Sequence, residues 1–368
     1  MTRKDPAMWP DNRLRDLFCI DLPIIQAPMA GSSGPDMALA VSKAGGLGSL
    51  ACATLDPGRL RDLLADVRDR TDRPLNVNFF AHASPKEDPD RDAAWLGRLS
   101  AYYAELGLDM PAALSAGPIQ PFDAARCAVI EECAPSVVSF HFGLPDPALV
   151  ARVKAAGCKI LSSATTVTEA RWLAANGCDA VIAQGYEAGG HRGMFLTDSL
   201  GSQMGTLSLV PQIADAVDVP VIAAGGIGDA RGIVAAFALG ASAVQIGTAY
   251  LFTEEATISP VYRQALDGAA NGETTLCNLM SGRPTRVLAN RMTRELGPMS
   301  ADAPTFPKGF AAMGPLRAAA EDIGSRDFSA HYCGQSAALG RKTTAFALTR
   351  DLASGARRWF APQGASRS

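Results

Sequence analysis

The sequence predicts an α/β protein: a (β/α)8 barrel of the TIM type, with a smaller, mainly helical cap inserted after the eighth strand. Three observations lead to this prediction. Helical patterns that end on glycine are repeatedly followed by short apolar runs, such runs occur eight times, and no G-x-G-x-x-G fingerprint follows the first of them. A doubly wound open sheet, the main alternative, would need that fingerprint after its first strand.

The eight predicted strands are short and rich in apolar and β-branched residues, as expected of strands that are buried on both faces. In chain order they are 22–27, 47–50, 74–80, 137–140, 159–163, 179–184, 220–224 and 243–247. Right-handed crossovers between parallel strands, repeated eight times, close the sheet into a barrel.

Two segments do not fit the repeat. The segment 81–122 carries an amphipathic helical pattern and is too long for an ordinary loop, so it is expected to cover part of the barrel mouth. The segment 253–333 has several prolines among short helical patterns and predicts the cap. The last helical pattern, 335–353, predicts either the eighth barrel helix or an end plug.

These segments give three predicted regions. They are a barrel over 1–252 that binds the cofactor, a cap or substrate domain over 253–333, and a C-terminal helix over 334–368 that returns to the barrel.

Composition excludes several classes of partner. A net charge of -3 with scattered Lys and Arg offers no field that would attract nucleic acid. No run of about 18 apolar residues exists, so no membrane partner is predicted, and a soluble, cytoplasmic protein is expected. The eight cysteines form no C-x-x-C pair and are interpreted as reduced core residues; no metal site is predicted. The oligomeric state is left open.

His141 is the strongest candidate for a catalytic group. It ends the strand 137–140, and Gly143 and Pro145 then break the extended run. Catalytic groups gather at the carboxyl ends of barrel strands, because a rigid strand directs the side chain into the mouth. The alternative is a half-buried histidine bonded to a backbone carbonyl, and the strand alone does not decide between the two.

Glycine loops after the last strands predict a phosphate site. Ala224-Gly225-Gly226 and Gly247-Thr248 follow the seventh and eighth strands, where barrels present backbone N–H groups to phosphate. A third glycine loop, 184–193, follows the sixth strand and would suit an anionic cofactor. Within it, His191 and Arg192 are interpreted either as a solvated ion pair with Glu187 or as direct contacts to phosphate or substrate.

Several motifs together resemble one family. They are Ile24-Ile-Gln-Ala-Pro-Met29, Asn76-Val-Asn-Phe-Phe80, Ser139-Phe-His-Phe-Gly143, the loop Ala183 to Gly193, Ala223-Ala-Gly-Gly-Ile227 and Gln245-Ile-Gly-Thr248. This set is similar to the nitronate monooxygenases, formerly called 2-nitropropane dioxygenases. The resemblance covers nearly the whole chain.

The resemblance implies an FMN-dependent barrel that oxidises alkyl nitronates, and possibly nitroalkanes, with O₂ to carbonyl compounds and nitrite. It implies that His141 is the catalytic base or a hydrogen-bond donor. It implies FMN contacts from Pro28, Met29, Asn78, Gln184, Gly189, Gly190, Ala224, Gly225, Gly226, Gly247 and Thr248. A substrate pocket is expected around His191, Phe306, Phe310 and Tyr332.

Three other functions stay open. An NAD(P)H-dependent FMN reductase acting on enoyl-thioesters or quinones would share the same barrel loops. A flavin-free barrel isomerase or lyase could use those loops for a phosphorylated substrate, and a flavin-binding module would bind without turnover.

Overall fold

The barrel is present and closed. The computed structural model describes residues 9–269 and 273–361, and within them eight parallel strands form one sheet in the order β1, β9, β8, β6, β5, β4, β3, β2. They are β1 (Ile24–Gln26), β2 (Gly48–Ala51), β3 (Leu75–Phe80), β4 (Val137–His141), β5 (Lys159–Ala164), β6 (Ala180–Gln184), β8 (Val221–Ala224) and β9 (Ala243–Ile246).

The two outermost strands, β1 and β2, meet across a parallel bridge between Ile25 and Leu47. Gln26 N donates to Leu47 O at 3.0 Å and Leu47 N donates to Ile24 O at 2.9 Å. The predicted (β/α)8 barrel is therefore confirmed.

The barrel interior is filled by apolar side chains from alternate strand positions, as the pattern of doubly buried strands requires. Leu14 and Phe18 of α1 (Arg13–Phe18) belong to this interior cluster, together with strand residues such as Val137, Ala180 and Ala243. These three residues begin their strands, so α1 closes the amino-terminal end of the barrel. This plug was not predicted from the sequence.

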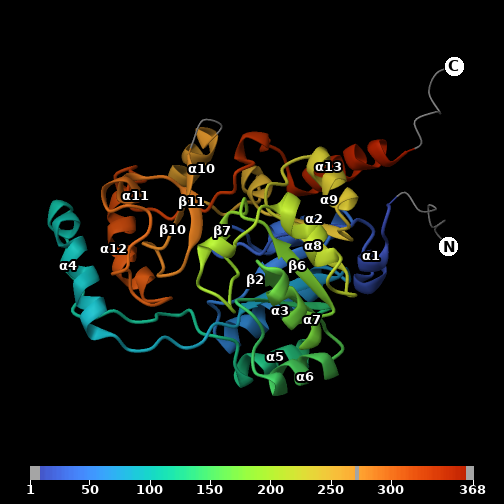
Figure 1. The fold of residues 1–368 in the computed structure, drawn as a ribbon, viewed down its shortest axis with the longest axis horizontal. Helices are drawn as coiled ribbons and strands as arrows, with labels where there is room; N and C mark the ends of the chain where they lie inside the picture. The colour runs from blue at the N-terminus through green and yellow to red at the C-terminus, as the bar shows by residue number, and fades with distance from the viewer. Residues whose placement is uncertain (1–8, 270–272, 362–368) are drawn as a thin grey trace.

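Helices cover the outside of the barrel (Figure 1). They are α2 (Pro35–Lys43), α3 (Pro57–Arg70), α5 (Ala124–Cys133), α6 (Pro147–Ala155), α7 (Val167–Ala175), α8 (Thr206–Ala214), α9 (Ala230–Ala238) and α13 (Ala345–Phe360). Side-chain caps fix several helix starts; for example, Asp56, Asp123 and Thr344 each accept a backbone N–H of the first turn. Because α13 packs against both α2 and α9, it takes the place of the eighth barrel helix.

The cap segment contains helices and a small sheet. Its elements are α10 (Pro260–Asp267), β10 (Thr274–Cys277), β11 (Thr285–Leu288), α11 (Arg291–Glu295) and α12 (Gly309–Asp322). Short 3-10 turns outside this segment are η1 (Leu200–Ser202), η2 (Thr248–Phe252) and η4 (Ala337–Leu339). β11 pairs antiparallel with β10 on one edge and with β7 (Gly190–His191) on the other. The loop after β6 is thus hydrogen-bonded to the cap.

The cap core draws on a second stretch of chain. In Figure 1, α4 (Pro89–Glu105) lies beside α11 and α12, away from the barrel helices. Trp95, Leu99 and Tyr103 of α4 are buried in one apolar cluster with cap residues such as Leu316. Tyr103 Oη also donates to Ala312 O at 2.7 Å. Part of the segment 81–122 therefore packs as cap, while the limits 1–252, 253–333 and 334–368 stay a prediction.

Candidate active site

A cavity of about 470 Å³ opens at the carboxyl ends of the barrel strands. All eight strands or the loops after them contribute to its wall, and the cap covers it with Tyr262, Phe310, Arg317 and Tyr332. The residues expected to bind the cofactor all line it: Pro28, Met29, Asn78, Gln184, Gly189, Gly190, Ala224, Gly225, Gly226, Gly247 and Thr248. His141 and His191 line it too. Phe306 stands just behind, with its ring centroid 5.4 Å from that of His191.

The loop after β8 has the geometry of an anion site. Gly225 and Gly226 have φ values of +109° and +71°, a left-handed region that glycine adopts without strain. Within the described residues, neither backbone N–H has a hydrogen-bond partner. Successive free N–H groups in such a turn form a concave cradle for phosphate or a similar anion.

The cavity ends beside these glycines at a thin backbone wall. Gln335 N donates to Glu187 O at 3.0 Å. A Cβ on Gly189 would lie 2.6 Å from Gly334 N, and one on Gly225 would lie 3.0 Å from Ala188 N. Side chains are excluded here because the segment 187–189 is in contact with the segment 334–335.

Gln245 supplies an unsatisfied acceptor inside the cavity. Its Oε1 is buried, and no donor reaches it from the part of the chain that the structure describes. A buried polar atom without a partner is costly, and a ligand hydroxyl would satisfy it. Gln245 was not predicted as a site residue from the sequence, although a polar residue inside the apolar run 243–247 was a usable signal. The cradle and Gln245 together fit a polyhydroxylated monophosphate.

His141 lies where the sequence predicted, but both its ring nitrogens are occupied. Nε2 lies 3.2 Å from His191 O, and Nδ1 lies 3.1 Å from Ser163 Oγ. Because a carbonyl oxygen only accepts, Nε2 carries the proton and Nδ1 accepts from the serine hydroxyl. Burial lowers the pKa of His141 to about 4, so the ring is neutral at pH 7. Its bond to a backbone carbonyl and its place in the cavity wall are each what one of the two interpretations predicted.

His191 presents the free nitrogen. Its Nε2 lies 2.9 Å from Ser281 Oγ in the cap, whereas Nδ1 has no partner among the described residues and is not a buried atom. Since His191 lines the cavity, Nδ1 is open to it. Burial of the ring, with smaller contributions from His141, Arg283 and His82, lowers the pKa of His191 well below its ordinary value. His191 is a neutral imidazole with one accessible nitrogen.

Aromatic rings form the wall around His191. Their centroids lie between 5.4 and 6.3 Å from that of His191, and they belong to Phe80, Phe142, Phe306, Phe310 and Tyr332. The Arg283 guanidinium lies 4.2 Å from the centre of the Phe142 ring. Such a wall excludes water and stabilises an apolar substrate group by contact.

Neither interpretation of Arg192 holds. Its side chain is fully buried, and it donates to Gly185 O at 2.6 Å, to Gln184 O at 2.7 Å and to Gln203 Oε1 at 3.1 Å. The carboxylate of Glu187 instead accepts from Thr206 N and Oγ1. Arg192 holds the glycine loop in shape and reaches neither solvent nor the cavity. The sequence Gly-Gly-His-Arg-Gly does not indicate that the neighbouring residues His191 and Arg192 point in different directions, one into the cavity and the other into the loop.

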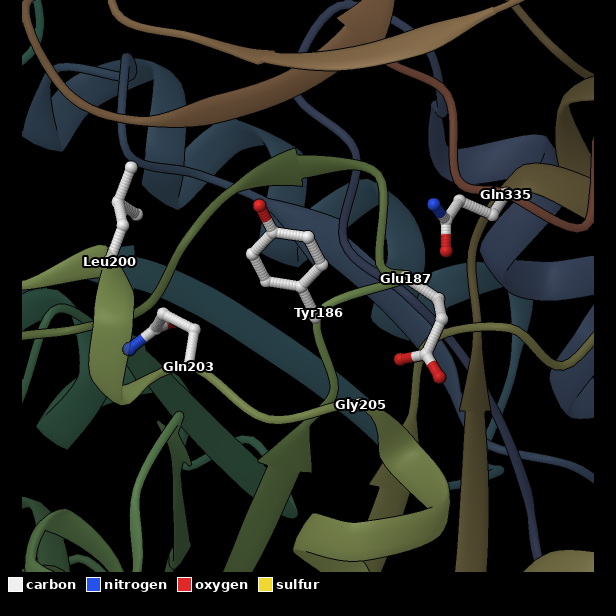
Figure 2. Close-up of a pocket in the computed structure, with 6 residues that line it drawn as sticks. All are labelled: Tyr186, Glu187, Leu200, Gln203, Gly205 and Gln335. Atoms are coloured by element: carbon white, nitrogen blue, oxygen red, sulfur yellow. The ribbon is translucent and has the colours of Figure 1, made fainter.

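A second pocket lies beyond the backbone wall. Figure 2 shows Tyr186, Glu187, Leu200, Gln203 and Gln335 around it. The acceptor atoms of Glu187 and of Gln203 are already hydrogen-bonded within the protein. The pocket therefore offers a ligand few unsatisfied groups, unlike the main cavity.

Comparison with known proteins points to one family. The model of the family described as "Nitronate monooxygenase" matches residues 11–355. The chain belongs to the nitronate monooxygenase family. A nitronate monooxygenase of Paraburkholderia phytofirmans is 44% identical over 343 residues, which cover 92% of this chain and 93% of that protein. The family assignment makes the protein an oxidoreductase.

Solved structures agree with this family member along almost its whole length. A nitroalkane oxidase from Streptomyces ansochromogenes superposes with a TM-score of 0.85 at 39% identity, covering 94% of this chain and 98% of that one. FabK from Thermotoga maritima superposes with a TM-score of 0.72 at 30% identity, covering 94% and 96%.

Residues 9–269 and 273–361 of this nitronate monooxygenase family member were searched for membrane-spanning helices and for clusters of metal-binding side chains. No helix there is long and apolar enough to cross a membrane. No group of three or more His, Cys, Asp or Glu residues there could hold a metal ion.

Proposed function

We propose that this family member binds FMN and oxidises alkyl nitronates, and some nitroalkanes, with O₂ to carbonyl compounds and nitrite. The observation that supports FMN as the cofactor is the anion cradle at one end of the cavity. There the backbone N–H groups of Gly225 and Gly226 are free and lie beside closely packed backbone. A single anion cradle of this kind suits the one phosphate of FMN. The orphan oxygen of Gln245 suits a ribityl hydroxyl.

When bound, FMN supplies the electron transfer and the reaction with O₂. The chain's own residues bind and orient the substrate. The aromatic wall keeps water out, and the neutral imidazole of His191 stands at the cavity surface, where its free nitrogen can accept a proton.

The proton-handling role has two candidates, His141 and His191. His141 would have to release Ser163 or the backbone of His191 before it could contact a substrate. His191 needs no such change, because its Nδ1 already faces the cavity. We therefore assign the base to His191, and we assign His141 the task of holding the loop that carries it.

The experiment compares two forms of one nitroalkane. Nitrite release is measured under air, without NAD(P)H, from the neutral nitroalkane and from its nitronate. We expect wild-type turnover with the nitronate, and the bound flavin, released by heat, to be FMN. His191→Ala should lower the rate with the neutral form by ~10²–10⁴-fold, as expected for loss of a general base, and should affect the nitronate less.

Two results would contradict the proposal. A folded protein that holds no flavin after reconstitution and forms no nitrite would remove the function. If instead His141→Ala abolished only the neutral-form reaction while His191→Ala did not, the assignment of the base would reverse. Both variants are compared at equal flavin content.

The similarity to FabK at 30% identity favours a reductase as the second candidate. It would use the same flavin cradle but take electrons from NAD(P)H. Rapid anaerobic bleaching of the flavin by NADH, without nitrite formation under air, would favour it.

A further inference from the structure

Ser281 of the cap contacts three groups at once. Its side chain is fully buried, and its Oγ lies 2.9 Å from His191 Nε2, 3.3 Å from Arg283 N and 3.3 Å from Arg283 O. This hydroxyl is the only described partner of the His191 ring nitrogens. It therefore decides which nitrogen carries the proton.

Only one assignment of protons satisfies all three contacts. A backbone N–H can only donate and a carbonyl can only accept, so Ser281 accepts from Arg283 N and donates to Arg283 O. Its remaining lone pair then accepts from His191 Nε2–H. If the hydroxyl donated to Nε2 instead, Arg283 O would lose this donor. The satisfied arrangement puts the proton on Nε2 and the lone pair on Nδ1, which faces the cavity.

The cap holds this hydroxyl rigidly. A Cβ on Gly309 would lie 2.6 Å from Ser281 C, and one on Gly282 would lie 2.0 Å from Pro304 O, so the turn is packed without slack. Next to it, Thr285 of β11 pairs with His191 of β7. The acceptor and the ring it orients are thus fixed to each other through one small sheet.

We propose that Ser281 is a positioning residue that keeps His191 in the Nε2–H tautomer, with Nδ1 ready to accept a proton from a neutral nitroalkane. This rests on the proposed function and deepens it. In the step, the Cα–H bond of the nitroalkane breaks, its proton moves to Nδ1, and the electron pair becomes the C=N bond of the nitronate. The resulting imidazolium keeps its Nε2–H bond to Ser281 Oγ. A nitronate substrate bypasses this step.

The test uses Ser281→Ala, Ser281→Thr and the control Ser329→Ala. Ser329 is also a buried cap serine, but its hydroxyl donates to Glu321 Oε1 at 2.6 Å. We expect Ser281→Ala to lower kcat with the neutral nitroalkane by on the order of 10-fold or more, which is less than the loss of the base itself. The rate with the nitronate should stay within about 3-fold, because that reaction needs no base. Ser281→Thr should restore much of the neutral-form rate, and Ser329→Ala should change neither.

A second measurement does not depend on turnover. The chain has four histidines, so ¹⁵N-histidine NMR with a His191→Gln reference identifies the His191 signals. The wild type should show protonated Nε2 and unprotonated Nδ1, and Ser281→Ala should shift or mix the tautomers. The inference is overturned if Ser281→Ala keeps both the tautomer and the neutral-form rate. Absence of nitrite from wild type with both substrate forms would instead remove the proposed function, and the NMR result would still decide the role of Ser281.

Discussion

At the scale of single residues, Gly193 limits where the loop that carries His191 can lie. A Cβ at this position would stand 2.9 Å from His141 Cε1 and 2.9 Å from Ser163 Cβ. Gly193 N also donates to Gln184 Oε1 at 2.7 Å, so the backbone cannot retreat freely. The absent side chain lets the loop rest on the imidazole.

Gly193→Ala should therefore destabilise the protein by ~1–3 kcal/mol, the usual cost of overpacking, and reduce nitrite release from both substrate forms. The control is Gly97→Ala in α4, an exposed helical position where an added Cβ meets nothing within 4 Å. That variant should gain up to about 1 kcal/mol, since alanine is the better helix former. Denaturant unfolding measures both. Equal stability of the two variants would show that the loop moves aside.

The pKa of His191 gives a prediction for the pH dependence of the neutral-form reaction. Burial, His141, Arg283 and His82 all favour the neutral ring, so its pKa lies well below 6.5. The base form then persists as the pH falls. We expect kcat/KM with the neutral nitroalkane to stay level through pH 6.5 and to fall only at lower pH. A titration midpoint near 6.5 would place the base on a solvated histidine instead.

At the scale of elements, an ion cluster ties the start of α12 to the first turn of α4 and the segment before it. Lys308, at the start of α12, is 2% exposed, and its Nζ lies 2.8 Å from both Glu87 and Asp92. Lys308 and Asp92 are largely buried whereas Glu87 is exposed, so the Lys308–Asp92 pair is more sensitive to loss of a partner than an exposed pair is.

Lys308→Met should destabilise the cap by ~1–3 kcal/mol, because the half-buried carboxylate of Asp92 loses its cation. Lys342→Met is the matched control, since its exposed ammonium pairs with Asp267 at the same 2.8 Å; its effect should stay below about 1 kcal/mol. Thermal unfolding and limited proteolysis within 81–88 are the measurements. Similar losses for both variants would contradict a role for burial.

The elements that the sequence predicted are those whose pattern is set by burial. All eight barrel strands were found because a strand buried on both faces is apolar throughout. β7 was not, since two residues carry no periodicity, and its pairing with β11 depends on a contact about 100 residues away in the chain. Ser281 was not predicted for the same reason, because its hydrogen-bond partner His191 lies 90 residues away in the chain. The glycine loops were predictable because only glycine permits those backbone angles.

At the scale of the whole molecule, every histidine is held neutral. Burial lowers the pKa of His82, His141 and His331 to about 4, and that of His191 falls well below its ordinary value. In the unfolded chain these groups take up protons near pH 6.5, so below that pH the unfolded state binds more protons than the folded one. The stability that neutral burial permits is present above pH 6.5 and is lost as the pH falls toward 4.

We expect the free energy of unfolding to decrease between pH 6.5 and 4 by up to about 1.4 kcal/mol per pH unit for each histidine. Chemical denaturation at several pH values measures this slope, and His82→Gln should reduce it. His82 suits the test because both its ring nitrogens are buried and lack hydrogen-bond partners in the described chain. A stability that is flat down to pH 4.5 would contradict the prediction.

The shared core of α4 and α12 also has a consequence for synthesis. α4 ends at Glu105 and α12 begins at Gly309, so 203 residues separate them. At translation rates of ~5–20 residues per second, α4 leaves the ribosome roughly 10–40 s before its partner exists. Meanwhile the apolar face that carries Trp95, Leu99 and Tyr103 has nothing to pack against. The nascent chain therefore presents a hydrophobic helix suited to a chaperone until the cap is complete.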